Sequence, residues 1–144
     1  MTPVILKRVI LEKSVRQRLS KSKMLTGTEM KSFSIRIMDT VATDEFKYHR
    51  FDTFFWAPRL KAILLGGEYL EENIIWVACY DLNNTLIDHL QVYYDNSEGF
   101  STVLSEINNN LITVFDKADE GNGESKQKPS VYSLNHEGKF IKLK

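Results

Sequence analysis

The chain has 144 residues with no net formal charge, of which 42% are hydrophobic and 26% are charged. Such a chain is too apolar to stay disordered and has the usual size of a single domain. The longest uninterrupted apolar run, residues 74–80, is far shorter than the about 20 residues of a transmembrane helix. The N-terminal residues also lack the continuous apolar region of a secretory signal. We therefore expect one domain in the cytoplasm, without a transmembrane segment.

The sequence contains one cysteine and three histidines. A single cysteine cannot form an internal disulfide or a multi-cysteine zinc site. His49, His89 and His136 lack the spacing of metal ligands, and no glycine-rich phosphate loop is present. We therefore expect neither a metal nor a cofactor.

The zero net charge hides an uneven distribution. Residues 1–31 carry +6, residues 32–120 carry −9, and residues 121–144 carry +3. The basic N-terminal segment could contact the phosphates of a nucleic acid. The candidate contacts are Arg16, Arg18, Lys21 and Lys23. We favour the alternative that these residues are solvated or lie on the acidic body, because charge runs usually mark solvated faces.

The N-terminal third predicts strands. Residues 3–12 contain β-branched pairs that favour a strand, although a helix remains open over 3–19. A basic, mobile continuation is expected up to Lys23, so that residues 1–31 would be partly mobile. Residues 32–41 alternate apolar and polar side chains, as a half-buried strand does. Residues 45–56 begin with the same alternation and are expected to pair with 32–41.

The second of these strands ends in the aromatic run Phe54, Phe55 and Trp56. Adjacent aromatic residues beside a strand usually belong to the core, but they can also form an exposed binding patch. We therefore retain these three residues as candidates for an interaction site.

Residues 58–65 favour a short helix, because Pro58 suits a first helical position and Gly66 suits the residue after a last turn. The alternative is a hairpin turn at Gly66–Gly67.

Residues 98–116 predict an amphipathic helix. Ser97 can cap it, and its apolar residues follow one helical stripe. That stripe consists of Phe100, Val103, Leu104, Ile107 and Leu111. Asn108–Asn110 are poor helix formers, so the helix could instead end there and leave 111–116 as a strand. We favour a continuous helix.

The C-terminal region predicts a linker and a hairpin. Residues 118–130 contain no large apolar side chain, which is typical of a flexible linker. Residues 131–144 are expected to close the same domain, 1–117, with a β-hairpin that turns at Asn135–Gly138 and is protected at its edge by lysines.

The strongest pattern is a β-hairpin over residues 74–95. A three-residue loop at Asn83–Thr85 gives a coherent apolar face, whereas a two-residue turn leaves both faces mixed. The favoured register places Cys79 opposite His89, with Asp81 next along the strand. A thiol, an imidazole and a carboxylate are the residue types of a nucleophile, a base and an orienting group. We nevertheless favour a structural pair with a buried, unreactive thiol, because catalytic groups usually lie on loops and strand ends.

These patterns predict an α+β fold. It would be a single domain with an antiparallel sheet of about five to seven strands, the helix 98–116 packed on that sheet, and the short helix 58–65. We expect a non-enzymatic intracellular protein-interaction module that binds a protein partner or forms a homo-oligomer. The alternatives are a nucleic-acid accessory protein that uses the basic segment, and a small enzyme with a Cys79/His89 dyad.

Overall fold

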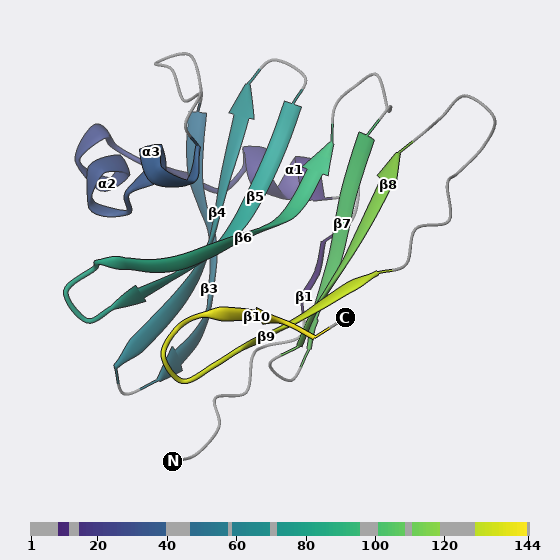
Figure 1. Cartoon of the computed structure of the whole chain (residues 1–144). Helices are drawn as coiled ribbons and strands as arrows, with labels where there is room; N and C mark the ends of the chain where they lie inside the picture. Colours follow the sequence, from purple (N-terminus) through teal and green to yellow (C-terminus); the bar gives the residue numbers. More distant parts are fainter. Residues whose placement is uncertain are drawn as a thin grey trace.

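The chain folds mainly into antiparallel strands, as Figure 1 shows. The computed structural model describes residues 9–11, 15–39, 47–57, 59–69, 72–95, 101–108, 111–118 and 129–143. The strands are β1 (Val9–Leu11), β2 (Lys23–Met24), β3 (Lys47–Ala57), β4 (Leu60–Tyr69), β5 (Glu72–Asp81), β6 (Leu86–Asp95), β7 (Ser101–Asn108), β8 (Leu111–Ala118), β9 (Ser130–Leu134) and β10 (Phe140–Lys142). The helices are α1 (Val15–Ser20), α2 (Gly27–Ser32) and α3 (Ile35–Met38).

The strands form one sheet in which sequence neighbours are also spatial neighbours. The order runs from β10 through β9, β8 and so on to β2, and β1 pairs with β7 beside this path. The prediction of an α+β fold with five to seven strands and a packed helix is therefore wrong. Within the described residues, the protein is a ten-stranded antiparallel sheet with three short helices.

The sheet is nearly divided in two. Among the described residues, β6 and β7 share a single register pair, Tyr94 with Val103. One half contains β2 to β6, and the other contains β1 and β7 to β10 (Figure 1). The inner faces of the two halves share a core, in which Leu64 and Ile75 of the first half join Ile107 and Ile112 of the second.

Helices α2 and α3 cover the side of the first half that points away from the inner core. Phe33, Ile35 and Met38 form a second core with residues of β4 and β5 such as Leu65 and Trp76. Two tyrosines of the sheet also anchor the helices. The Tyr80 hydroxyl donates to the Phe33 carbonyl at 2.7 Å, and the Tyr48 hydroxyl donates to the Asp39 carboxylate at 2.7 Å.

Strand β4 replaces the predicted helix 58–65 and the alternative turn at Gly66–Gly67, which are both wrong. Its apolar run is continuous because both faces of the strand are buried. Ala62 and Leu64 join the inner core, while Ile63 and Leu65 pack beneath the helices. Such a strand lacks the usual alternation of a half-exposed one. Gly66 lies in mid-strand because a Cβ atom there would collide with Leu19 of α1.

Strands β7 and β8 replace the predicted helix 98–116, which is also wrong. Val103 and Ile107 are buried and four residues apart. That spacing suits one face of a strand as well as one face of a helix. The apolar residues from Leu111 onward belong to a different strand that pairs back on β7.

The predicted strand 32–41 is wrong, because this segment contains the end of α2 and all of α3. Ile35 and Met38 are buried, three residues apart, whereas Ile37 is exposed. Strand β3 confirms the strand expected at 45–56, but it pairs with β2 and β4 instead. Of the strand expected at 3–12, the described part is β1.

The basic continuation up to Lys23 contains α1 and the start of β2. At the C-terminal end, β9 and β10 form a hairpin where the sequence predicted one. The linker expected at 118–130 lies largely outside the described residues. None of the described helices is long and apolar enough to cross a membrane.

Candidate functional site

The β5–β6 hairpin is present, but its register differs from the predicted one. Ile74 lies opposite Tyr94 as expected. Two register shifts then follow, between Ile75 and Trp76 and between Cys79 and Tyr80. Each shift places an extra residue on β6, as in a β-bulge, and bulges bend a strand. The bend accompanies the departure of β6 from β7.

The shifted register separates the candidate dyad. Cys79 pairs with Asp88, while His89 pairs with Ala78. Successive positions of a strand point to opposite faces of the sheet. Cys79 therefore faces the inner core, and His89 lies on the other face. The predicted pairing of Cys79 with His89 is wrong.

Cys79 is a buried thiol, as predicted, and its ionised form is disfavoured. Burial, and to a smaller extent the nearby Asp88 carboxylate, raises the pKa of Cys79 to about 11. The thiolate is the nucleophilic form of cysteine. At neutral pH this side chain is therefore a packing group, in contact distance of Gly138, where a Cβ atom would lie 3.1 Å from the sulfur.

The other two members of the candidate set also have structural surroundings. Asp81 caps the hairpin turn, since its Oδ1 accepts from the backbone N–H groups of Asn83 at 2.8 Å and Thr85 at 3.0 Å. Partial burial lowers the pKa of His89, against a smaller opposing effect of Asp88. Among the described residues, no three histidine, cysteine, aspartate or glutamate side chains gather into a potential metal site.

Two of the basic candidate residues contact the protein itself. The Arg18 guanidinium lies 4.9 Å from the centroid of the Phe51 ring, and Lys23 lies 4.0 Å from the Glu29 carboxylate. Lys21 is exposed, and the side chain of Arg16 lies outside the described part of the structure. Glu29 lies within the basic segment itself, so the role of this segment stays a prediction.

The aromatic run Phe54–Trp56 belongs to β3. The backbone of this run pairs with β4 through an irregular register. Its side chains lie outside the described part of the structure, so its role as an interaction site stays a prediction.

The second half of the sheet presents an apolar outer face that the sequence did not reveal. We call this surface the outer face, and its exposed apolar side chains are Ile10, Leu111, Phe115, Ile141 and Leu143. They are between 37% and 53% exposed. The described structure has eight exposed large hydrophobic side chains, and these are five of them.

The register shows that these five side chains share one side of the sheet. One row across the strands contains Leu111, Ser133 and Ile141. A second row contains Ile10, Glu106, Thr113 and Val131. Leu143 extends this row, since its N–H donates to the Val131 carbonyl at 2.7 Å. In a third row, Phe115 lies opposite Leu104, which is partly buried against the inner core.

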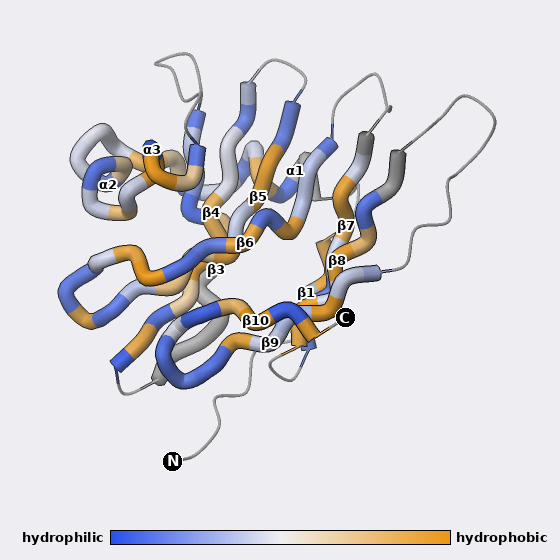
Figure 2. Tube along the Cα trace, viewed as in Figure 1, coloured by the Kyte–Doolittle hydropathy of each residue, from blue (hydrophilic) through white to orange (hydrophobic). Residues whose placement is uncertain are grey.

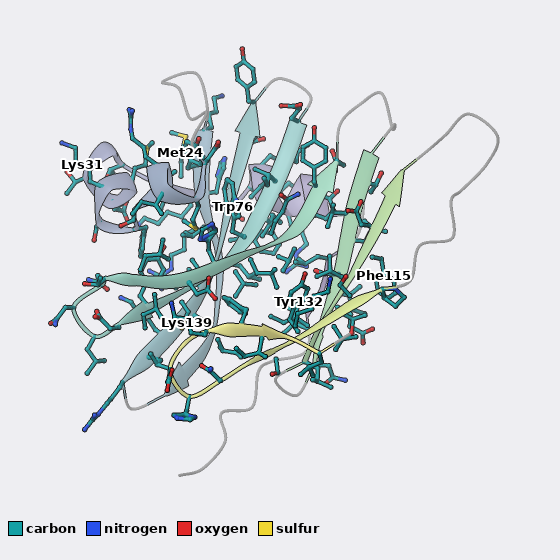
Figure 3. All side chains as sticks on the ribbon, viewed as in Figure 1. Met24, Lys31, Trp76, Phe115, Tyr132 and Lys139 are labelled. Atoms are coloured by element: carbon teal, nitrogen blue, oxygen red, sulfur yellow. The ribbon has the colours of Figure 1, made fainter. Side chains whose placement is uncertain are left out.

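The alternate positions of the same strands face inward. Leu11, Ser105, Ile107 and Ile112 are all buried. Figure 2 shows hydrophobic segments on β7 to β10 as well as on β4 and β5. Figure 3 places Phe115 on the opposite side of the molecule from Met24 and Lys31, and so away from α2. The helices thus cover one half of the sheet and leave the outer face of the other half exposed.

Sequence reasoning missed this surface because it placed Leu111 and Phe115 on a helix. A signal was present in the alternation of Leu111, Thr113 and Phe115 after the asparagines 108–110. Comparison with known proteins gives no match to a family model, a curated protein or a solved structure.

Proposed function

We propose that the protein is a non-enzymatic protein-interaction module and that the outer face is its binding surface. The observation that supports this is the concentration of exposed apolar side chains on one side of β1 and β7 to β10. Scattered apolar side chains are normal on a protein surface, whereas a contiguous patch is typical of a binding site.

The size of the patch supports a specific role. Five side chains that are about half exposed present roughly 400 Å² of apolar surface, which is comparable to the largest patch of a typical monomer. The polar groups between them, such as Thr113 and Ser133, would supply the hydrogen bonds that interfaces contain. A rigid sheet holds these groups in place before a partner arrives, which lowers the entropic cost of binding.

The surroundings of the candidate catalytic residues favour binding over catalysis. Cys79 is protonated at neutral pH, Asp81 is engaged in a turn, and His89 faces away from the thiol. In the described structure these three side chains do not come together as a nucleophile with its base.

A cytoplasmic location remains a prediction.

Site-specific photo-cross-linking in the cells that produce the protein tests this function. A photoreactive phenylalanine analogue at position 115 or 141 is expected to form covalent adducts with protein. The same analogue at Ile37 or Leu82, which are 63% and 62% exposed but lie outside the outer face, serves as the matched control. Absence of adducts at 115 and 141, or equal yields at all four positions, would refute the proposal.

A further inference from the structure

We infer that the partner of the outer face is a second copy of this chain, bound face to face. This inference rests on the proposed function, because it names the occupant of the same surface. It depends on three features of the described residues: the area of the face, its charge, and the order of its residues across the strands.

The area is sufficient for a weak dimer. Strands lie about 4.8 Å apart and rise about 3.3 Å per residue, so the face measures roughly 20 Å across the five strands and roughly 13 Å along them, from Leu111 to Phe115. Its five apolar side chains expose roughly 400 Å². With the polar groups between them, each copy would bury roughly 500 Å² of accessible surface, and the pair roughly 1,000 Å², which is the lower limit for a specific interface. We therefore expect a dissociation constant on the order of micromolar, and an equilibrium that depends on protein concentration.

The charge of the face suits self-association. Glu106 is the charged side chain among the described residues in the three rows that form the face. Complementary charge is the usual means by which an interface selects a strongly acidic or basic partner. A nearly neutral face selects neither, and it can pack on itself without like-charge repulsion. The whole chain also has no net charge that would oppose association.

The order of the strands makes the face self-complementary. A two-fold axis that runs along β8, the central strand of the face, would place Phe115 next to Phe115 of the second copy and Leu111 next to Leu111. The same axis would place β7 of one copy over β9 of the other, so that Glu106 lies opposite Val131 and not opposite another Glu106. It would place Ile10 of β1 opposite Leu143 after β10. Isologous interfaces of this kind are the commonest in homodimers.

Sedimentation equilibrium of the purified chain between about 5 and about 500 µM tests the inference. The unaltered chain is expected to shift from monomer to dimer over this range. Phe115→Lys places two like charges together at the axis and is expected to weaken the dimer by at least about tenfold. Ile37→Lys and Leu82→Lys are matched controls and should leave the equilibrium unchanged.

A charge-swap experiment separates interface loss from misfolding. Phe115→Lys and Phe115→Glu should each associate more weakly alone, and an equimolar mixture should restore the dimer, because the two side chains then meet as an ion pair. If Phe115 variants fail to fold, the same pair of substitutions at Leu111, which also lies on the two-fold axis, replaces them. Failure of every mixture to associate would overturn the inference.

The cross-links distinguish this inference from the proposed function. An adduct at position 115 with twice the mass of the chain supports both. A purified chain that stays monomeric, together with cellular adducts to a different protein at 115, overturns the second copy and leaves the interaction module standing. A monomeric chain without adducts overturns both.

Discussion

Cys79 illustrates how a reactive residue type becomes structural through its surroundings. Its sulfur lies in the inner core beneath Gly138, and its ionised form is disfavoured by burial and by the Asp88 carboxylate. The free energy of unfolding must therefore fall at alkaline pH, because the thiol ionises at a lower pH in the unfolded chain than in the folded chain.

The expected sign follows from proton binding. The pKa of Cys79 rises from an ordinary value of 9.0 to about 11 on folding, so the folded state retains a proton that the unfolded state loses between these values. The free energy of unfolding should fall by about 2–3 kcal/mol as pH rises through this window, and this thiol should have no effect below it. Burial also raises the pKa of Tyr48 and Tyr80, which contribute in the same direction at higher pH.

Urea denaturation of the unaltered chain and of Cys79→Ala, measured from about pH 8 to about pH 11, isolates the thiol. The variant should be less stable at neutral pH, because it leaves a small cavity. Its stability should decrease less steeply above about pH 9. Parallel pH profiles for the two proteins would show that Cys79 is not the group responsible.

At the scale of elements, two hydrogen bonds join the β9–β10 hairpin to β6. Asp88 Oδ2 accepts the backbone N–H of Phe140 at 2.9 Å, and the Lys139 ammonium donates to the Ile87 carbonyl at 3.3 Å. The first contact satisfies an N–H group at the edge of the sheet. An edge strand with unpaired N–H groups can recruit another strand, so Asp88 both closes the inner core and protects this edge.

Asp88→Ala should therefore loosen the hairpin. We expect a loss of about 1–2 kcal/mol in the free energy of unfolding, because the N–H loses a charged acceptor. Hydrogen exchange at the Phe140 amide should accelerate more than exchange in β4. Asp116→Ala, which removes an exposed carboxylate from β8, is the control. Equal exchange rates at Phe140 in both variants would contradict a closing role for Asp88.

The sequence predicted the strands whose patterns are local. β3, the β5–β6 hairpin and the turn before Phe140 follow from alternation, β-branched residues and asparagine- or glycine-containing turns. Helix α3 was missed because Ile35 and Ile37 alternate like strand residues, and its burial depends on distant β4 and β5. The register of the hairpin was missed because β6 has two bulges, and no local pattern in the sequence specifies them.

The candidate site was harder to predict than the fold. Leu111 and Phe115 come together with Ile10, Ile141 and Leu143 only through pairing of strands that are distant in sequence. Once 98–116 was interpreted as a helix, these residues could not be placed on a common face. Residues with individually plausible chemistry, such as Cys79 and His89, were separated by the same long-range geometry.

The whole molecule is asymmetric in how it covers its sheet. In the β2–β6 half, α2 and α3 bury the side of the sheet that points away from the inner core. In the β1 and β7–β10 half, the same side is the outer face, and its apolar side chains are exposed. A sheet face usually buries its apolar side against another layer. Within the described part of the chain no layer covers this face, and a second copy of the chain would supply one.

Methyl NMR spectra recorded at increasing protein concentration test this account most directly. The methyl resonances of Ile10, Leu111, Ile141 and Leu143 should shift or broaden together as the chain associates. Those of Ile37 and Leu82, which are 63% and 62% exposed and lie elsewhere, should stay unchanged. Concentration-dependent changes at Ile37 and Leu82 with none on the outer face, or spectra that do not change up to about 1 mM, would contradict self-association through the outer face.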